Sequence, residues 1–241
     1  VAGMGADLYE SYVGSVLSAS ALGAFAGMGE RGFIIPFLIA VAGVLASIIG
    51  TFFVRTGENA SQRSLLSSLR RGVYAATGIM ALASGAIIHL VLGTGNGDGT
   101  TVSPWGLYGS VLFGLAAGAI MGVITEYFTS DSYKPTKRLA KSSDTGSATV
   151  IIDGLALGMR STLASVITVG AAIAGSYFLA GGAGNPSLGL YGVGIAAVGM
   201  LSTLGITLST DAYGPVADNA GGIAEMTGQD PIVRKRTDAL D

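Results

Sequence analysis

Six apolar runs, each near the length that crosses a lipid bilayer, constrain the fold of this chain most strongly. They cover residues 8–28, 33–54, 72–92, 105–128, 161–180 and 190–208. A spanning helix needs about 20 apolar residues, because the hydrocarbon core is about 30 Å thick. Only 12% of the residues are charged, against about 25% in soluble domains. We therefore predict an all-α, polytopic membrane helix bundle of six spans, with residues 1–241 forming a single membrane domain.

Basic residues gather in every second connection between these spans. The second connection, the fourth connection and the segment after the last span hold most of them: Arg55, Arg63, Arg70 and Arg71; Lys134, Lys137, Arg138 and Lys141; Arg234, Lys235 and Arg236. Residues 93–104 and 181–189 contain neither Lys nor Arg. Loops rich in Lys and Arg stay in the cytoplasm. We predict a multi-pass protein of the cell membrane with both chain ends cytoplasmic.

Small residues recur every fourth position in two of the spans. One set is Gly114, Gly118 and Gly122, and the other is Ser15, Ala19, Gly23 and Gly27. In lipid, such stripes let helix backbones approach closely, since no hydrophobic force drives helices together there. We interpret both sets as packing surfaces.

Several classes of partner and chemistry are not indicated. The chain has no cysteine and a net charge of −2, and no basic patch is typical of nucleic-acid binding. His89 has no other metal-ligating residue near it in sequence, so we interpret it as a hydrogen-bonded interfacial histidine. Asp153 and Arg160 fall about two helical turns apart, which favours an ion pair between them. Lys134, Lys137 and Arg138 suit either a solvated loop or an anion-binding one.

Carboxylates recur at intervals of seven residues after the last apolar run, at Asp211, Asp218 and Glu225. If the helix continues, they stack on one face about 10 Å apart. Pro215 removes the N–H that the Asp211 carbonyl would otherwise accept. Carboxylates at the mouth of a membrane bundle are costly and by default mark a functional site. A solvated acidic loop is the less favoured alternative.

A second acidic pair, Asp7 and Glu10, opens the first predicted span and shares a helix face, with Ser11 one residue further on. Without basic neighbours in sequence, two such carboxylates need a cation, a shared proton, or a lysine from a distant helix. Favourable placement of acids at a helix N-terminus is the alternative. It accounts for Asp7 but not for Glu10, which lies a turn deeper.

Four sequence motifs together resemble those of the membrane-bound, ion-pumping pyrophosphatases. They are Gly-Met-Gly-Ala-Asp-Leu-Tyr-Glu-Ser-Tyr at 3–12, Thr-Glu-Tyr-Phe-Thr-Ser with Tyr-Lys-Pro-Thr at 125–136, Asp-Gly-Leu-Ala-Leu-Gly-Met-Arg-Ser at 153–161, and the acidic stretch at 211–226. The resemblance runs the whole length of the chain. It implies a homodimer of roughly sixteen-helix subunits that hydrolyses pyrophosphate in a Mg²⁺-dependent cytoplasmic funnel and pumps Na⁺ or H⁺ across the bilayer. The six spans would be the sixth to the eleventh.

The resemblance also implies roles for individual residues. Asp211 and Asp218 match the family's catalytic and magnesium-binding carboxylates, while Asp7 and Glu10 match its ion gate, to which the Ser11 hydroxyl could add a ligand. K⁺ and Na⁺ are the activators that the family suggests, and no organic cofactor is implied. The chain begins without an initiator methionine. The family's water-positioning aspartate would fall before Val1. The stretch that distinguishes potassium-dependent members would fall after Asp241, as would the family's late Lys- and Asp-rich helices. We expect an internal piece of a longer protein, inactive alone.

The pumped ion and the class of protein each have an alternative. The residues around Asp7 and Glu10 resemble the potassium-dependent sodium branch of that family, and Gly14 stands where plant-type proton pumps carry a Glu. A proton pump is the alternative within the family. A cation-coupled secondary transporter without hydrolysis is the alternative from another class. It would explain Asp7 and Glu10, but not a row of carboxylates at a cytoplasmic mouth.

Overall fold

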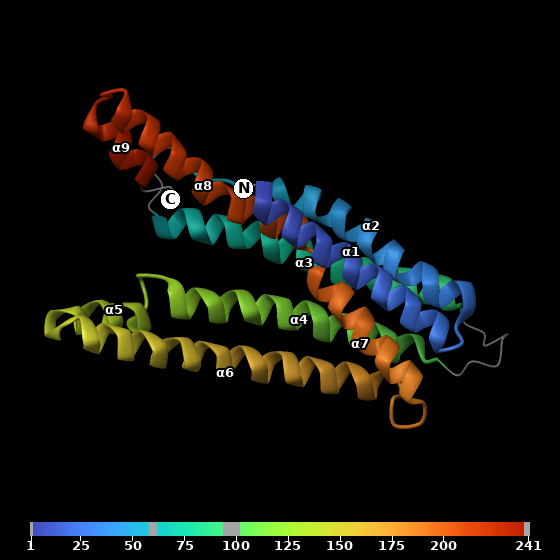
Figure 1. Cartoon of the computed structure of the whole chain (residues 1–241). Coiled ribbons are helices and arrows are strands. Elements are labelled where there is room, and N and C mark those ends of the chain that lie inside the picture. The colour runs from blue at the N-terminus through green and yellow to red at the C-terminus, as the bar shows by residue number, and fades with distance from the viewer. Residues whose placement is uncertain (1, 58–61, 94–101, 239–241) are drawn as a thin grey trace.

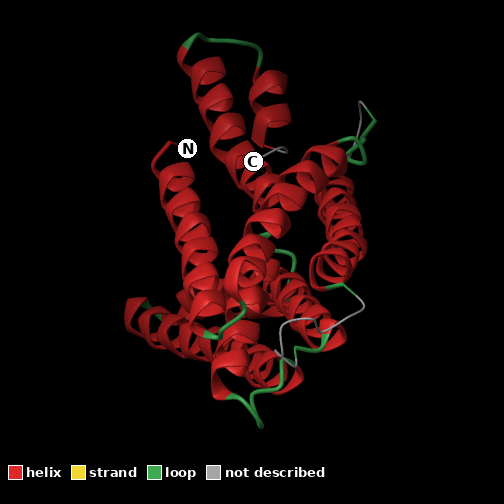
Figure 2. Ribbon diagram, turned by 90° about the vertical axis from the view of Figure 1, so that its right-hand side faces the viewer, coloured by secondary structure: helices red, strands yellow, loops and turns green. Residues whose placement is uncertain are grey.

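The computed structural model describes residues 2–57, 62–93 and 102–238. Within these ranges the chain forms helices and no strand (Figure 2), which confirms the predicted all-α membrane bundle. Most of the connection at 93–104, which contains neither Lys nor Arg, lies outside the described residues. The elements in chain order are α1 (Ala2–Phe25), α2 (Gly29–Thr51), α3 (Gln62–Leu92), α4 (Pro104–Thr129), α5 (Lys134–Ser142), η1 (Ser143–Thr145), α6 (Ser147–Leu179), α7 (Pro186–Leu201), α8 (Leu204–Met226) and α9 (Pro231–Asp238).

Fewer helices have the length and apolar character of a membrane span than the six expected. Four described stretches have both: α2, Ser67–Leu92 of α3, Pro104–Thr145 beginning with α4, and α6. A fifth span arises if α7 and α8, bent by 43° at the break between them, are taken together. The predicted run 190–208 crosses that break. The stretch predicted at 8–28 forms α1, whose apolar residues are diluted by Glu10 and by serines at 11, 15, 18 and 20.

The two ends of the chain lie toward the same end of the bundle (Figure 1). The short helices α5 and α9, which carry many of the basic residues, lie at this end as well. The turns from α1 to α2 and from α6 to α7 lie at the opposite end. We call the end that holds both chain termini, α5 and α9 the basic end. The expectation that the two termini lie on one side therefore agrees with the path of the chain.

The core lies where α7 crosses the other helices. α7 packs on α4, α1 and α6, while α2 packs on α1 and α3. The largest fully buried side chain is Tyr191 of α7, and its hydroxyl donates a buried hydrogen bond of 3.0 Å to the Gly32 carbonyl of α2. Ile35, Ile39 and Leu107 belong with it to one buried apolar cluster. A membrane bundle of this kind holds together by packing and by such interhelical hydrogen bonds.

The small-residue stripes pack as predicted over most of their length. A Cβ at Gly114 would overlap the backbone carbonyl of Ala196, and one at Gly118 would lie 3.2 Å from the Met200 carbonyl, so both glycines face α7. Gly23 meets the backbone of Gly32 in the same way. Gly122 and Gly27 differ, because nothing lies within 4 Å of a Cβ placed at either, and Gly27 lies beyond the end of α1. The stripe of α4 therefore ends one turn before the sequence pattern does.

His89 departs from its predicted hydrogen-bonded state. Its ring packs edge-on against Trp105, with 4.6 Å between ring centroids. The buried Nε2 atom finds no hydrogen-bond partner among the described residues. The ring is therefore held by aromatic packing between α3 and α4.

The two glycines of α4 provide a matched test of this packing. Gly114→Ala should lower the free energy of unfolding by about 1–3 kcal/mol, because the added methyl meets a backbone carbonyl that cannot move alone. Gly122→Ala should be neutral or stabilising by up to about 1 kcal/mol, since alanine favours a helix and the site is open. The measurement is the thermal unfolding midpoint in detergent. Equal midpoints for the two variants would contradict the α4–α7 contact.

Candidate functional site

The acidic stretch forms one continuous helix, α8, so the condition for stacking the three carboxylates on one face is met. It runs from Leu204 through Pro215 to Met226. The Asn219 side-chain amide donates a hydrogen bond of 2.6 Å to the Pro215 carbonyl. Asp211, Asp218 and Glu225 are all exposed. By helix geometry they form one row on α8, with about 10 Å between successive members.

Glu225 is paired, and this divides the row. Arg234 of α9 makes two ion pairs. Its Nη1 atom lies 3.5 Å from a Glu225 carboxylate oxygen, and its Nε atom donates a hydrogen bond of 2.7 Å to the Asp238 carboxylate. α9 can lie against α8 here because Gly221 has no side chain: a Cβ there would be 2.8 Å from the Thr237 hydroxyl. Among the described residues, Asp211 and Asp218 form no ion pair. Two unpaired carboxylates therefore remain where the sequence indicated three.

The predicted gate residues Asp7, Glu10 and Ser11 lie in the first turns of α1 and are exposed. α1 contacts α8 as well as α2 and α7, and both views place the start of α1 beside α8 (Figures 1 and 2). The Tyr12 hydroxyl donates a hydrogen bond of 2.9 Å to the Ala40 carbonyl, which ties this part of α1 to α2. The two acidic segments, 204 residues apart from Asp7 to Asp211, therefore lie on neighbouring helices.

The chemistry of these carboxylates suits magnesium, but they form no complete site by themselves. Mg²⁺ prefers oxygen ligands at about 2.1 Å. Side chains seven residues apart on a helix are separated by about 10 Å, so Asp211 and Asp218 cannot both bind one ion directly. In the part of the chain that the structure describes, no three Asp, Glu, His or Cys side chains form a group that could hold a metal. Each carboxylate would need ligands from elsewhere.

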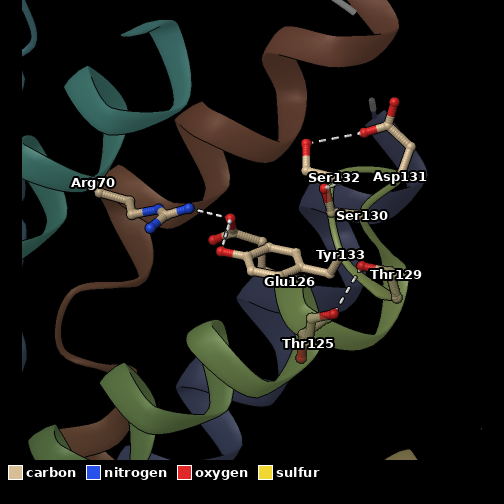
Figure 3. Close-up of polar contacts among 8 residues, drawn as sticks. All are labelled: Arg70, Thr125, Glu126, Thr129, Ser130, Asp131, Ser132 and Tyr133. Atoms are coloured by element: carbon tan, nitrogen blue, oxygen red, sulfur yellow. Dashed lines mark hydrogen bonds and ion pairs between the residues drawn. The ribbon is translucent and has the colours of Figure 1, made fainter. Parts of the chain in front are cut away.

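A second polar cluster, at the basic end between α3, α4 and α5, was not foreseen from the sequence. Arg70 of α3 pairs with Glu126 of α4, and the Tyr133 hydroxyl lies 3.4 Å from the same Glu126 oxygen (Figure 3). The Arg70 and Glu126 side chains are 41% and 25% exposed. The sequence pattern places Arg70 only among the basic residues of the second connection. Its partner lies 56 residues away, so no local pattern could reveal the pair.

The expected ion pair between Asp153 and Arg160 is absent. Neither side chain forms an ion pair with any described residue, although both line one pocket. Residues seven apart on a helix are about 10 Å apart along its axis, farther than the three- or four-residue spacing at which side chains pair.

Comparison with known proteins identifies the family. The whole chain, residues 1–241, matches the family model described as inorganic H⁺ pyrophosphatase, and the chain belongs to that family. It is 52% identical over 251 residues to a putative K⁺-stimulated pyrophosphate-energized sodium pump of Bacteroides thetaiotaomicron, and 44% identical over 241 residues to one of Clostridium tetani. It is 41% identical to a K⁺-insensitive pyrophosphate-energized proton pump of Methanosarcina mazei.

All of this chain aligns with each of the three relatives, but it covers only 33%, 34% and 34% of their respective lengths. The chain therefore spans about a third of the relatives it matches. The resemblance drawn from the four sequence motifs is confirmed at the level of the family.

The contact of Arg234 with Glu225 can be tested by hydrogen exchange. Arg234→Gln should raise amide exchange in residues 231–238 about five-fold, because the solvent-exposed ion pairs of Arg234 with Glu225 and Asp238 together contribute up to about 1 kcal/mol to the order of α9. Lys235→Gln removes the same charge from the neighbouring residue, which forms no ion pair among the described residues, and should leave exchange unchanged. Similar exchange rates in the two variants would mean that Arg234 does not hold α9 against α8.

Proposed function

We propose that the protein containing this chain hydrolyses inorganic pyrophosphate and uses the reaction to pump Na⁺ across the membrane. The single observation that carries the proposal is the pair of exposed carboxylates Asp211 and Asp218, which form no ion pair with any described residue and lie on α8 of a member of this family. Glu225 forms an ion pair with Arg234, so we do not include it among the proposed magnesium-binding carboxylates. The proposal also rests on the names of the relatives from Bacteroides thetaiotaomicron and Clostridium tetani.

Pyrophosphate is a small polyanion, so carboxylates can hold it only through cations between them. Asp218 would bind one magnesium ion and Asp211 would support a second, because their spacing on α8 excludes a single shared ion. Bound magnesium neutralises charge on a phosphate leaving group and orients water for attack. Asp211 and Asp218 contribute by keeping their charge free of protein cations. Pro215, on the turn between them, leaves the Asp211 carbonyl without its helical donor.

We infer that Asp7, Glu10 and Ser11 form the ion gate. Two carboxylates on one helix face repel each other, so one must be protonated, paired with a residue of another segment, or bound to the transported cation. Carboxylate and hydroxyl oxygens are hard ligands that suit Na⁺. The contact between α1 and α8 supports a short path from the hydrolytic carboxylates to the gate. K⁺ and Na⁺ would act as activators, as the name of the Bacteroides thetaiotaomicron relative suggests for K⁺.

The architecture of the whole protein is part of the proposal. We propose six spans for this segment, counting α1 and the bent pair of α7 and α8 with the four apolar helices. They would belong to a roughly sixteen-helix subunit of a homodimer. Both ends of this segment would be cytoplasmic, because α5 and α9 bring their basic residues to the end where the chain begins and ends. Proton pumping is the second candidate, favoured by the 41% identity to the Methanosarcina mazei proton pump.

Hydrolysis is tested at Asp218. Asp218→Asn in the full-length protein should lower pyrophosphate hydrolysis by more than about 100-fold at every magnesium concentration, since even outer partners of metal ligands contribute 10–100-fold. Asp144→Asn removes one charge from η1, near α5, and should keep activity. Phosphate release in detergent is the measurement. Normal turnover by the Asp218 variant would exclude its magnesium role, and absence of hydrolysis in the wild type would favour a secondary transporter.

The gate and its ion are tested at Glu10. Glu10→Gln keeps the shape of the side chain and removes its charge, so hydrolysis should lose its sodium activation and sodium-22 uptake into vesicles should fall toward background. Glu30→Gln makes the same change in the first turn of α2, at the opposite end of the bundle, and should pump normally. Wild-type uptake should survive a protonophore. Pyrophosphate-driven acidification without sodium uptake would identify a proton pump, and normal pumping by the Glu10 variant would exclude the gate role.

A further inference from the structure

We propose that a basic pocket between α4, α5 and α6 binds the phosphate of an anionic phospholipid headgroup. The pocket has a volume of about 370 Å³, and α5, which supplies two of its cations, lies at the basic end of the bundle (Figure 1). Its charged lining residues are Lys134 and Arg138 of α5 and Asp153 and Arg160 of α6, and Tyr127 and Phe128 at the end of α4 form an aromatic wall. It lies on different helices from the carboxylates of α1 and α8, so the inference does not rest on the proposed hydrolysis.

The charges of the pocket favour an anion. Three cations face a single carboxylate, which leaves an excess of two positive charges. Among the described residues, none of these four side chains forms an ion pair. Glu126, which precedes the aromatic residues Tyr127 and Phe128 on α4, is paired with Arg70, and Asp131 and Asp144, on either side of α5, do not line the pocket. Converging cations without partners repel one another, and an anion between them removes that repulsion. Arginine and lysine are the side chains that bind phosphate groups.

The depth of the pocket matches the level of lipid headgroups. α6 has 33 residues, so it is about 50 Å long and must extend beyond a hydrocarbon core about 30 Å thick. From Arg160 to the end of α6 at Leu179 the helix rises about 28 Å. If Leu179 lies at one boundary of the core, Arg160 lies at the other. Tyr127, which is 43% exposed, suits the same boundary as an interfacial aromatic residue.

The surface next to the pocket suits acyl chains. Leu163 and Ile167 follow Arg160 by three and seven residues on the same face of α6, and they are 61% and 62% exposed. A phospholipid whose phosphate lies at Arg160 would run its chains along these side chains toward the middle of the bilayer. A free phosphate ion shares the chemistry of the headgroup but would make no use of this apolar surface. Basic pockets between membrane helices at the cytoplasmic side are known to hold anionic lipid headgroups.

The test compares two double variants of the full-length protein. Lys134→Gln with Arg138→Gln removes the two α5 cations of the pocket, and Lys137→Gln with Lys141→Gln removes two α5 cations that do not line it. Native mass spectrometry in detergent with phosphatidylglycerol measures lipid retention. The pocket variant should bind phosphatidylglycerol at least about tenfold more weakly than the wild type, and the control variant should bind it normally. Retention of phosphatidylcholine should not differ among the three proteins.

A single variant, Arg160→Gln on α6, guards against loss of the α5 fold and should weaken phosphatidylglycerol binding in the same direction. Unchanged retention in the pocket variants would overturn the proposal. Equal losses in the pocket and control double variants would also overturn it, because they would indicate a diffuse attraction to the basic surface. A second arm titrates inorganic phosphate into lipid-depleted protein. Displacement of phosphatidylglycerol from the pocket by phosphate at millimolar concentration would reject the lipid and identify free phosphate as the ligand.

Discussion

The close approach of α4 and α7 at Gly114 is the contact on which the position of the acidic helix depends. α7 leads directly into α8 across the 43° bend, so whatever fixes α7 also fixes where Asp211 and Asp218 lie. Gly114 under the Ala196 carbonyl and the Tyr191 hydroxyl on the Gly32 carbonyl hold α7 from two sides. Neither contact involves a charge. The site is therefore carried by backbone packing in lipid, where hydrophobic burial contributes little to helix association.

The sequence predicted most of the long helices and their order, because each apolar run has the length that a helix needs to cross a bilayer, but the single run predicted at 190–208 is divided between α7 and α8. It also identified the acidic segments of α1 and α8. It could not identify the partners of Glu126 and Glu225: Arg70 is 56 residues from the first, and Arg234 reaches the second only because Gly221 lets α9 fold back on α8. Gly122 continues the stripe in sequence, but α7 has ended by Leu201, before it could contact that turn.

The basic end of the bundle separates two kinds of charge. Two of the acidic side chains at this end are paired with arginines of other helices, Glu126 of α4 with Arg70 and Glu225 of α8 with Arg234. Asp211 and Asp218 lie outside these pairs, whereas the pocket of α5 and α6 has an excess of positive charge. A structure that paired these groups with one another would hold neither a cation nor a phosphate. Because the carboxylates of α8 and the cations of the pocket lie on different helices, each group stays available to bind ions of the opposite charge.

The contrast between α6 and α7 has a consequence for how the chain is assembled after synthesis. α6 is long, and only 6% of its apolar window is buried in the bundle, so it is stable in lipid through its own backbone hydrogen bonds. α7 has 16 residues and rises only about 24 Å, less than the hydrocarbon thickness, and half of its residues are buried against other helices. Insertion of α6 can therefore precede any tertiary contact. α7 needs α1, α2 and α4 already in place, and the acidic helix that follows it reaches its position last.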